Sequence, residues 1–469
     1  MSKTVLHDGD EGILLILKDV KEKYLKKGQI RSPVHVVYGG AHLFKADTPQ
    51  KLGRIALDSI KTYAPNFVDF AGAMWLKGSE TLPRYPKIVA EMERQLAKNP
   101  EKVRKDNFAA WFAWTVYQRT IDKLKKEPVE DFRIDFEDGY GFRSDEEEDS
   151  HAISASDKLA AGFLKNKITQ FSGFRIKSFS PETFGRSVHT LHLFIENFLE
   201  KTGGKLPENF VVTLPKAADK KEVKELCRYL KKIEKKAGLR NGSIKIEIMI
   251  ETPSAVVDKK GRIAIRSLVE SAKGRCTSVH FGAYDYTASL GIVSSHQHLR
   301  HEACNFARQM MLAALSPLEI RLSDSVTTNM PVPVHKGSKL SKVQNEENRR
   351  VVHSAWRVHY NNVANSMING FYQSWDLHPN QLVARYAAVY AFFLEAKDEQ
   401  ALRLKTFIEK EKQASLTGNT FDDAASAQGI ANFFIRAIDC VALTENEIME
   451  LTGLSYVDLR SAFSQNRER

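Results

Sequence analysis

Short apolar stretches alternate with amphipathic stretches along most of this chain, and the alternation predicts its architecture. Between residues 34 and 382, eight runs of strand length are separated by sequence with apolar residues at helical spacing. In chain order these runs are VHVVYGG, DFRIDFEDGYG, FRIKSF, FVVTLPKA, IKIEIMIET, TSVHFGAYDYT, RLSDSVTT and GFYQSWDLHPNQL. Strands that alternate with helices form parallel sheets with right-handed crossovers, and eight such units favour a closed barrel over an open sheet. We therefore predict an α/β fold, a (β/α)8 TIM barrel.

Two long segments depart from this alternation and predict additions to the barrel. Residues 74–126 are mostly helical in pattern and too long for a simple crossover, so we expect a helical insertion beside the barrel. From residue 383 onward the pattern is only helical, which predicts a C-terminal helical domain over residues 382–469. Residues 1–381 are then the TIM-barrel catalytic domain.

Three shorter segments also receive assignments. A short helix is expected over residues 11–25, and the acidic run SDEEEDS at residues 144–150 predicts a loop. That loop would lead to a helix over residues 157–165. Thr444 and Glu447 have the spacing of a capping box, which predicts the start of a helix in the C-terminal domain.

Acidic residues follow two consecutive predicted strands within residues 246–285. Glu251 comes directly after IEIMI, and Asp285 comes shortly after SVHFGA. If these strands are parallel neighbours, both carboxylates emerge at the same edge of the sheet, where barrel enzymes carry their active sites. Two hard oxygen ligands facing one cleft suit Mg²⁺, which keeps water positions open for substrate. The alternative is a pair of unrelated structural acids.

Charged residues also end three earlier strands. Glu137 and Asp138 follow FRIDF, and they are either site carboxylates or a structural pair that holds a loop. Arg175 could bind a carboxylate bidentately or stabilise an enolate oxygen, or it could form a salt bridge inside the barrel. Lys216, in TLPKA, could stabilise charge or pair with a glutamate of the next strand.

Two histidines lie close to strand ends and allow two interpretations each. His378, in DLHPN, could act as a general base, although a His-Pro turn that closes a barrel strand explains it as well. His42 follows the Gly39–Gly40 turn, and both a structural and a site role are open for it.

Composition narrows the class of protein. The chain has 469 residues, 42% of them hydrophobic and 27% charged, as in ordinary globular proteins. Its four cysteines are scattered without a CxxC pair, which favours reduced thiols over a disulfide framework or a zinc site. No apolar run approaches the roughly 20 residues of a membrane span, and the N-terminus lacks a secretory pattern. We therefore expect a cytoplasmic protein without a membrane partner.

The formal net charge of +11 raises the question of a polyanionic partner. Many of the lysines, however, lie on helix faces opposite an apolar stripe, as in KKEVKELCRYLKKIEKKAG, which is typical of a solvated surface. The C-terminal TENEIMELTGLSYVDLRSAF superficially resembles a helix-turn-helix, but it sets Asp458 against Arg460 and is not strongly basic. Nucleic acid is therefore not an expected partner.

Six of these motifs occur in a familiar order. The order of FRIDFEDGYG, FRIKSF, VVTLPKA, IMIETPSA, HFGAYDYTASLGI and WDLHPNQL resembles the HpcH/HpaI aldolase and citrate lyase beta-subunit superfamily. Malyl-CoA lyases and, more distantly, malate synthases belong to it. The similarity spans nearly all of residues 34–382. One departure is RIKS in the arginine strand, where many relatives have RVN.

The resemblance implies a role for each site residue. Glu251 and Asp285 match the Mg²⁺ ligands, and Arg175 matches the catalytic arginine that binds substrate and stabilises the enolate. Glu137 and Asp138 match the catalytic acidic pair that orders metal-bound water.

The resemblance also extends the site beyond the strand-end charges. Gly282 and Ala283, in the GxxD-like strand, are assigned to substrate binding. A C-terminal acid completes the site in malyl-CoA lyases and malate synthases, and Asp422 and Asp423 are its candidates here.

The predicted function is therefore a Mg²⁺-dependent carbon–carbon lyase, aldolase-like or citrate lyase-like. Its substrate would be a 2-oxo acid or an acyl-CoA, bound as a small-molecule carboxylate or thioester and cleaved through a metal-stabilised enolate. A malate synthase-like condensing enzyme is the alternative within the superfamily. An alternative of another class is a non-catalytic barrel that serves as a binding or regulatory module. A homo-oligomer is expected.

Overall fold

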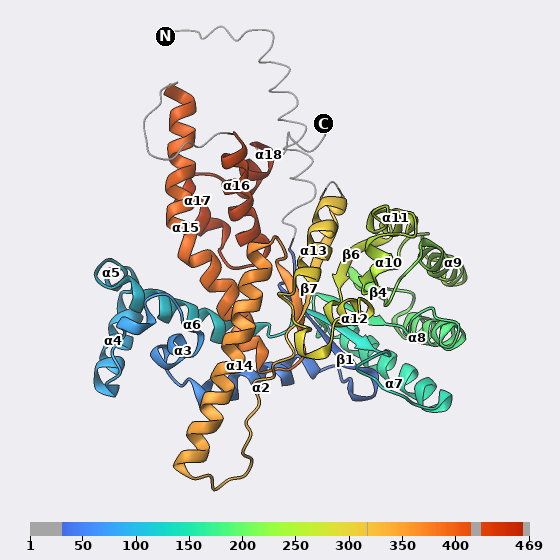
Figure 1. Cartoon of the computed structure of the whole chain (residues 1–469), viewed down its shortest axis with the longest axis horizontal. Helices are drawn as coiled ribbons and strands as arrows, with labels where there is room; N and C mark the ends of the chain where they lie inside the picture. The colour runs from blue at the N-terminus through green and yellow to red at the C-terminus, as the bar shows by residue number, and fades with distance from the viewer. Residues whose placement is uncertain (1–30, 317, 414–423, 463–469) are drawn as a thin grey trace. The chain divides into compact units, whose positions relative to one another are not determined.

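The computed structural model describes residues 31–316, 318–413 and 424–462 (Figure 1). The chain forms two compact units. One comprises Pro33–Ala388, and the other comprises the described residues of Met1–Ser32 and Val389–Arg469. The predicted boundary at residue 382 falls at the start of α15 (Gln381–Gln413), and the two units divide within that helix.

A closed parallel barrel is the centre of the first unit. In the described residues its strands are β1 (His35–Gly40), β2 (Asp131–Asp135), β3 (Phe171–Arg175), β4 (Asn209–Leu214), β5 (Lys245–Ile250), β6 (Cys276–Phe281), β7 (Arg321–Val326) and β8 (Gln373–Asp376). Each pairs with the next in parallel, and β8 pairs back with β1. These strands coincide with the eight predicted runs, so the TIM-barrel prediction is confirmed.

Helices cover the outside of the barrel. Those that follow strands β2 to β7 are α7 (Asp145–Leu164), α8 (Phe184–Thr202), α9 (Lys220–Lys236), α10 (Pro253–Val256), α11 (Ile265–Ser271), α12 (Ala283–Ser289), α13 (Glu302–Leu315) and α14 (Lys342–Ile368). Figure 1 shows α7, α8 and α9 as consecutive members of this outer layer. Aromatic side chains join helix to strand, as where the rings of Phe174 and Phe194 stack at 4.2 Å. These contacts bury the apolar face of each strand.

A polar network occupies part of the barrel interior, which explains the charged residues within the strands. Glu247 on β5 accepts hydrogen bonds from Thr213 (2.8 Å), Ser278 (2.6 Å) and Tyr38 (2.9 Å). The same carboxylate pairs with Arg133 on β2 at 2.9 Å. A buried charge persists only where partners satisfy it, and here they come from neighbouring and opposite strands.

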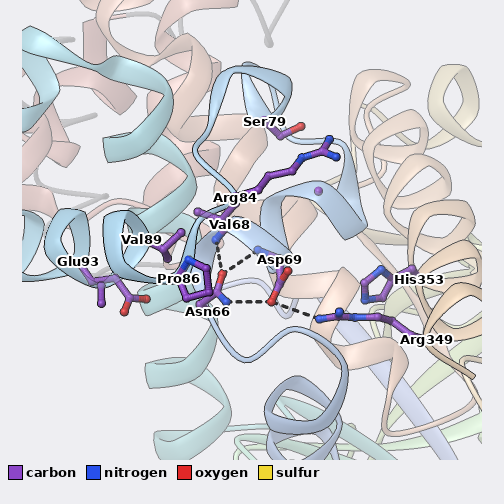
Figure 2. Close-up of a pocket in the computed structure, with 12 residues that line it drawn as sticks. Asn66, Val68, Asp69, Ser79, Arg84, Pro86, Val89, Glu93, Arg349 and His353 are labelled. Atoms are coloured by element: carbon purple, nitrogen blue, oxygen red, sulfur yellow. Dashed lines mark hydrogen bonds and ion pairs between the residues drawn. The ribbon is translucent and has the colours of Figure 1, made fainter. Parts of the chain in front are cut away.

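A group of helices occupies the connection between β1 and β2, where a helical insertion is predicted. It comprises α2 (Thr48–Tyr63), α3 (Phe67–Met74), α4 (Pro86–Lys98), α5 (Pro100–Asp106) and α6 (Phe108–Lys126). Phe70 of α3 packs edge-to-face on Tyr117 of α6, with ring centroids 5.3 Å apart. Arg349 of α14 pairs with Asp69 of α3 at 3.2 Å, which ties this group to the barrel's own helices (Figure 2).

One predicted loop is a helix. The acidic run at residues 144–150 was expected to be a loop, but α7 already begins at Asp145. Ser144 accepts from the Glu147 N–H while the Glu147 side chain accepts from the Ser144 N–H, a complete capping box. The acids that follow lie at the positive end of the helix dipole, where negative charge is stabilising. The prediction was wrong because it gave charge density more weight than the cap.

The second unit contains α16 (Ala424–Asp439), α17 (Glu445–Thr452) and α18 (Tyr456–Ala462). Thr444 caps α17 with Glu447 in a complete capping box, as predicted. Arg460, on the helix that superficially resembles a recognition helix, pairs with the buried Asp439 at 2.9 Å. That contact gives the helix a packing role.

Two further predictions concern a helix near the N-terminus and membrane-spanning segments. The helix expected over residues 11–25 lies outside the described residues. Among the described helices, none is both long enough and apolar enough to cross a membrane.

Candidate active site

The acids predicted as metal ligands lie at the carboxyl ends of neighbouring strands. Glu251 directly follows β5, and Asp285 lies in the first turn of α12 just beyond β6. The two strands pair in parallel, so both residues open toward the same mouth of the barrel. Glu251 is 1% exposed, whereas the Asp285 side chain is 43% exposed. Glu251 is therefore enclosed by the protein, whereas Asp285 is partly exposed at the mouth of the barrel.

The Glu251 carboxylate is held by backbone on two sides. Its Oε2 accepts the Lys216 N–H at 2.8 Å. A Cβ at Gly282 would lie 2.4 Å from Glu251 Cγ and Oε1, so only glycine leaves room for this carboxylate. Burial, together with the charges of Glu137 and Asp285, raises the pKa of Glu251 to about 8.

Lys216 links the acids of the mouth. Its ammonium group pairs with Glu137, with Asp138 at 3.2 Å and with Asp285 at 3.9 Å. Burial alone would lower the pKa of Lys216, but these carboxylates outweigh it and raise that pKa. Its backbone has a positive φ of 49°, which is costly for a residue with a side chain and often marks functional sites.

Arg175 ends β3 and is buried with its guanidinium held on several sides. Nε donates to Asp135 Oδ1 at 2.7 Å and Nη2 to Asp135 Oδ2 at 2.6 Å, a bidentate pair. Nη1 pairs with Glu137 Oε2 at 2.8 Å. The guanidinium also lies over the Tyr38 ring, 4.8 Å from its centroid. Asp135 thus fixes the orientation of Arg175 and leaves Nη1 facing the acidic turn.

The Glu137–Asp138 turn is shaped by Asp135 as well. Asp135 accepts the Glu137 N–H at 3.0 Å and the Gly139 N–H at 2.7 Å. Burial raises the pKa of Glu137. Burial would also raise the pKa of Asp138, but Arg175 and Lys216 outweigh it and lower that pKa.

Negative charge exceeds positive charge at this mouth. The carboxyl groups joined there, among the described residues, are Asp135, Glu137, Asp138, Glu251 and Asp285, and their cations are Arg175 and Lys216. The raised pKa of Glu251 follows from its burial and from this excess. A divalent cation beside Glu251 and Asp285 would offset both effects, so the residues present fit Mg²⁺.

The fit to Mg²⁺ rests on two acids, Glu251 and Asp285. No group of three or more His, Cys, Asp or Glu side chains gathers as a possible metal cluster in the part of the chain that the structure describes. Mg²⁺ commonly keeps several water ligands and takes only one or two carboxylates from the protein. Water and substrate would therefore complete the coordination.

The remaining predicted residues have varied surroundings. The N–H of Gly282 donates to Ile250 O at 2.9 Å, and that of Ala283 donates to Ser325 Oγ at 3.0 Å. Both amides are thus bonded within the protein, and a substrate-binding role for these residues stays a prediction. His378 accepts the Asn380 N–H at 3.2 Å through Nδ1, as in a turn. Asp422 and Asp423 lie outside the described residues.

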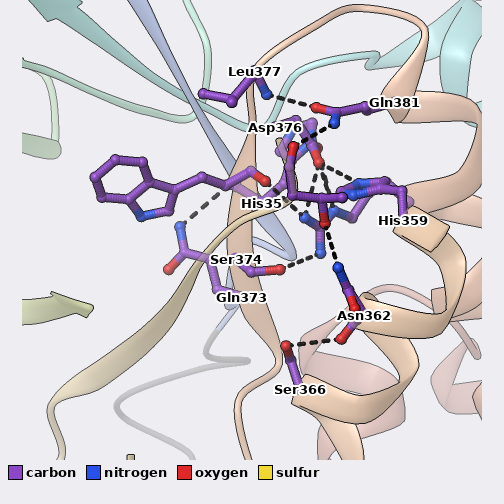
Figure 3. Close-up of polar contacts among 12 residues, drawn as sticks. His35, His359, Asn362, Ser366, Gln373, Ser374, Asp376, Leu377 and Gln381 are labelled. Atoms are coloured by element: carbon purple, nitrogen blue, oxygen red, sulfur yellow. Dashed lines mark hydrogen bonds and ion pairs between the residues drawn. The ribbon is translucent and has the colours of Figure 1, made fainter. Parts of the chain in front are cut away.

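A second buried polar network surrounds Asp376 at the end of β8 (Figure 3). Its carboxylate bonds to His35 Nδ1, His359 Nε2 and Arg385 Nη2, each at 2.8 Å. Trp375, the preceding residue, instead packs with Met249 in a core cluster within the barrel. Alternation along β8 therefore separates this network from the mouth, and we assign it to structure.

The sequence did not identify the contacts of two residues of the site. Asp135 lies within the predicted strand DFRIDF, and only the register, which sets it opposite Arg175, identifies it as the partner of that arginine. Lys216 was left open between charge stabilisation and pairing with a glutamate. The structure joins its backbone to Glu251 and its side chain to Glu137.

Comparisons with known proteins add a family and a set of similar folds. Residues 16–467 match the family described as Domain of unknown function (DUF6986). No curated protein matches the sequence.

Several solved structures are similar in fold. A citrate lyase from Burkholderia xenovorans LB400 aligns with a TM-score of 0.51 and 18% identity over 74% of this chain and 91% of that chain. A Haloferax volcanii malate synthase, in a magnesium/glyoxylate complex, gives 0.42 and 13% over 71% and 88%. An HpcH/HpaI aldolase/citrate lyase family protein from Burkholderia cenocepacia J2315 gives 0.33 and 12% over 59% and 85%. At these identities the likeness concerns the fold, and of the three only the citrate lyase exceeds 0.5.

Proposed function

Because the chain belongs to the family described as Domain of unknown function (DUF6986), a description that names no activity, we propose a function from its site. The protein is a Mg²⁺-dependent carbon–carbon lyase, acting on a 2-oxo acid or an acyl-CoA type substrate. The observation that carries the proposal is Glu251: a buried carboxylate with a pKa raised to about 8, beside Asp285 and within reach of the Arg175 cluster. A buried acid that must be ionised requires a cation.

Each residue of the mouth has a part in the proposal. Glu251 and Asp285 would hold Mg²⁺, which supplies a Lewis acid for a substrate oxygen. Arg175 binds the carboxylate or the developing enolate oxygen through Nη1, in place of part of its ion pair with Glu137, because Asp135 occupies the other two nitrogens. Lys216 holds Glu137 and Asp138 in place and limits their mutual repulsion.

The same residues would serve a condensing enzyme that forms the bond in the reverse sense. Enolate stabilisation is common to cleavage and condensation, so the choice between them depends on the substrate. We favour cleavage, with a homo-oligomeric enzyme and a small carboxylate or acyl-CoA substrate as parts of the proposal. A non-catalytic barrel would need neither the metal pair nor the arginine.

Metal binding tests the proposal first. Isothermal titration with Mg²⁺ should give a saturable site in the wild type that is lost in the Glu251→Gln/Asp285→Asn double variant. The exposed acids Glu208 and Asp106 offer a matched control, and Glu208→Gln/Asp106→Asn should bind like the wild type. Equal binding by the wild type and the Glu251/Asp285 double variant would overturn the metal pair.

Turnover tests the chemistry. Oxo-acid and acyl-CoA release should be followed over a panel of 3-hydroxy dicarboxylates and their CoA esters, with Mg²⁺ and with EDTA. Cleavage that depends on Mg²⁺ and on Arg175 supports a lyase. Activity only with an oxo acid and an acyl-CoA together would support the condensing alternative. No turnover in either direction would favour a binding module.

A further inference from the structure

A cavity of about 640 Å³ lies between the helices that precede β2 and helix α14, and none of its lining residues belongs to the barrel mouth (Figure 2). Its walls come from α3, the segment before α4, α4 itself and α14, all within the first compact unit. Its volume is in the range of small-molecule sites. The residues that carry its charge are Asp69, Arg84, Glu93 and Arg349.

One side of the cavity is already neutralised. Arg349 pairs with Asp69 at 3.2 Å and donates to Tyr63 O at 3.1 Å. Asn66 donates to the same Asp69 carboxylate at 2.8 Å. These groups satisfy one another along that wall of the cavity.

Arg84 differs from them, because among the described residues it has no ion-pair or hydrogen-bond partner. In Figure 2 no dashed line joins Arg84 to another residue drawn, and Glu93 lies on the other side of the view. The first turn of α4, two residues after Arg84, contains no acid and has no side-chain cap. The exposed Arg84 therefore offers a positive charge that no acid of the described residues engages, whereas Glu93, which pairs with no cation in the described part of the chain, lies on the other side of the view.

Gly72 keeps the space open. It lies inside α3 and lines the cavity, and a Cβ built on it would meet no atom within 4 Å. Glycine is a poor helix former compared with alanine, so a residue with a side chain would favour the helix. Because Gly72 lines the cavity, such a side chain would take up open space at its wall. Apolar contact is available nearby from Val68 and Val89.

We propose that this cavity binds a small organic anion, whose carboxylate or phosphate group pairs with Arg84 and whose neutral part fills the space beside Gly72. A guanidinium suits both kinds of anionic group, since each accepts two parallel hydrogen bonds. This site is independent of the proposed lyase chemistry. It could be present whether or not Glu251 and Asp285 hold a metal.

Two probes distinguish the sources of the anion: sodium succinate for a carboxylate and glycerol 3-phosphate for a phosphate. Binding is measured by isothermal titration and by thermal shift in EDTA, and again in the Glu251→Gln/Asp285→Asn background, so that the barrel mouth does not contribute. Saturable binding of either probe supports the proposal and identifies the ligand class. Binding of neither probe to the wild type overturns it.

Substitutions locate the binding. Gly72→Leu fills the cavity and should abolish the signal, and Arg84→Ala should weaken it by about tenfold or more. Gly185→Leu and Arg54→Ala are the matched controls, because Gly185 is another helical glycine with open space around it and Arg54 is an exposed arginine outside the cavity. Wild-type binding by a folded Gly72→Leu variant, or equal weakening by the controls, would contradict the site.

Discussion

The backbone N–H of Lys216 donates to the Glu251 carboxylate at 2.8 Å, and the same residue sends its ammonium group to Glu137. It does so with a positive φ of 49°, a conformation that glycine adopts more readily. A strained backbone persists only where surrounding contacts hold it. Lys216, two positions beyond the end of β4, thus connects the buried acid that follows β5 with the acidic turn that follows β2.

Replacing Lys216 by methionine should destabilise the protein by about 1–2 kcal/mol at neutral pH, because Glu137 and Asp138 lose a cation and repel each other. Added Mg²⁺ should restore part of that loss. Urea unfolding with and without Mg²⁺ measures both effects. Lys205→Met, an exposed control, should change little. Unchanged stability of the Lys216 variant would show that the acids do not need its charge.

Gly282→Ala should displace the Glu251 carboxylate, since the new Cβ would lie 2.4 Å from it. We expect a loss of about 1–3 kcal/mol of stability from overpacking. Mg²⁺ affinity should fall by about tenfold or more. Gly185→Ala meets no atom within 4 Å and is the control. Calorimetry of Mg²⁺ binding measures the effect, and wild-type affinity in the Gly282 variant would separate Glu251 from the metal.

Arg175→Lys keeps the charge but cannot reproduce the bidentate pair with Asp135. Once a substrate is found, we expect turnover to fall by about 100-fold or more, as when a preorganised oxyanion donor is removed. Asp135→Asn tests positioning: it should lower kcat more than it changes KM. Steady-state kinetics of both variants measures this, and an Arg175→Lys enzyme as fast as the wild type would rule out the arginine's role.

Acid should destabilise the protein through the Asp376 network in two stages. Burial lowers the pKa of His359 from 6.5, so its contribution is full above about pH 6.5 and is lost as the pH falls below that value. Burial would raise the pKa of Asp376, but Arg385 and the bonds from His35 and His359 outweigh it and hold that pKa well below 3.8. The contribution of Asp376 is therefore lost only below about pH 3.8.

His359→Gln isolates the first stage. Glutamine can still donate to Asp376 but does not titrate, so the variant should lose less stability than the wild type between pH 7 and pH 5, by about 1 kcal/mol. Melting temperatures of both proteins are measured across this range. The difference between them cancels the contribution of the other histidines, which both proteins share. Parallel pH profiles would mean that His359 is not held neutral.

The sequence predicted the barrel because strand-length runs and helical periodicity repeat eight times, and each run became a strand. It also predicted that Glu251 and Asp285 follow neighbouring strands, because parallel strands share one carboxyl edge. The sequence did not predict which residues Asp135 and Lys216 contact. Which side chain meets Arg175 or Glu137 depends on register and on a single left-handed residue, and neither leaves a periodic signal.

The cavity beside Gly72 could not be predicted from the sequence either. Arg349 and Asp69 are far apart in the chain and meet only because α14 packs against α3. No pattern within either helix specifies that contact. Long-range packing, more than local propensity, creates this surface.

The interior of the barrel has a consequence for how this protein can change. Glu247 is satisfied jointly by Tyr38, Arg133, Thr213 and Ser278, so an apolar replacement of any one of them leaves this buried carboxylate short of a donor. Neutral drift at these positions is therefore blocked one residue at a time and requires several substitutions together. Directed evolution that leaves the residues of the mouth unchanged would reach a more apolar barrel interior only through several substitutions made together. The outer helices remain open to single substitutions.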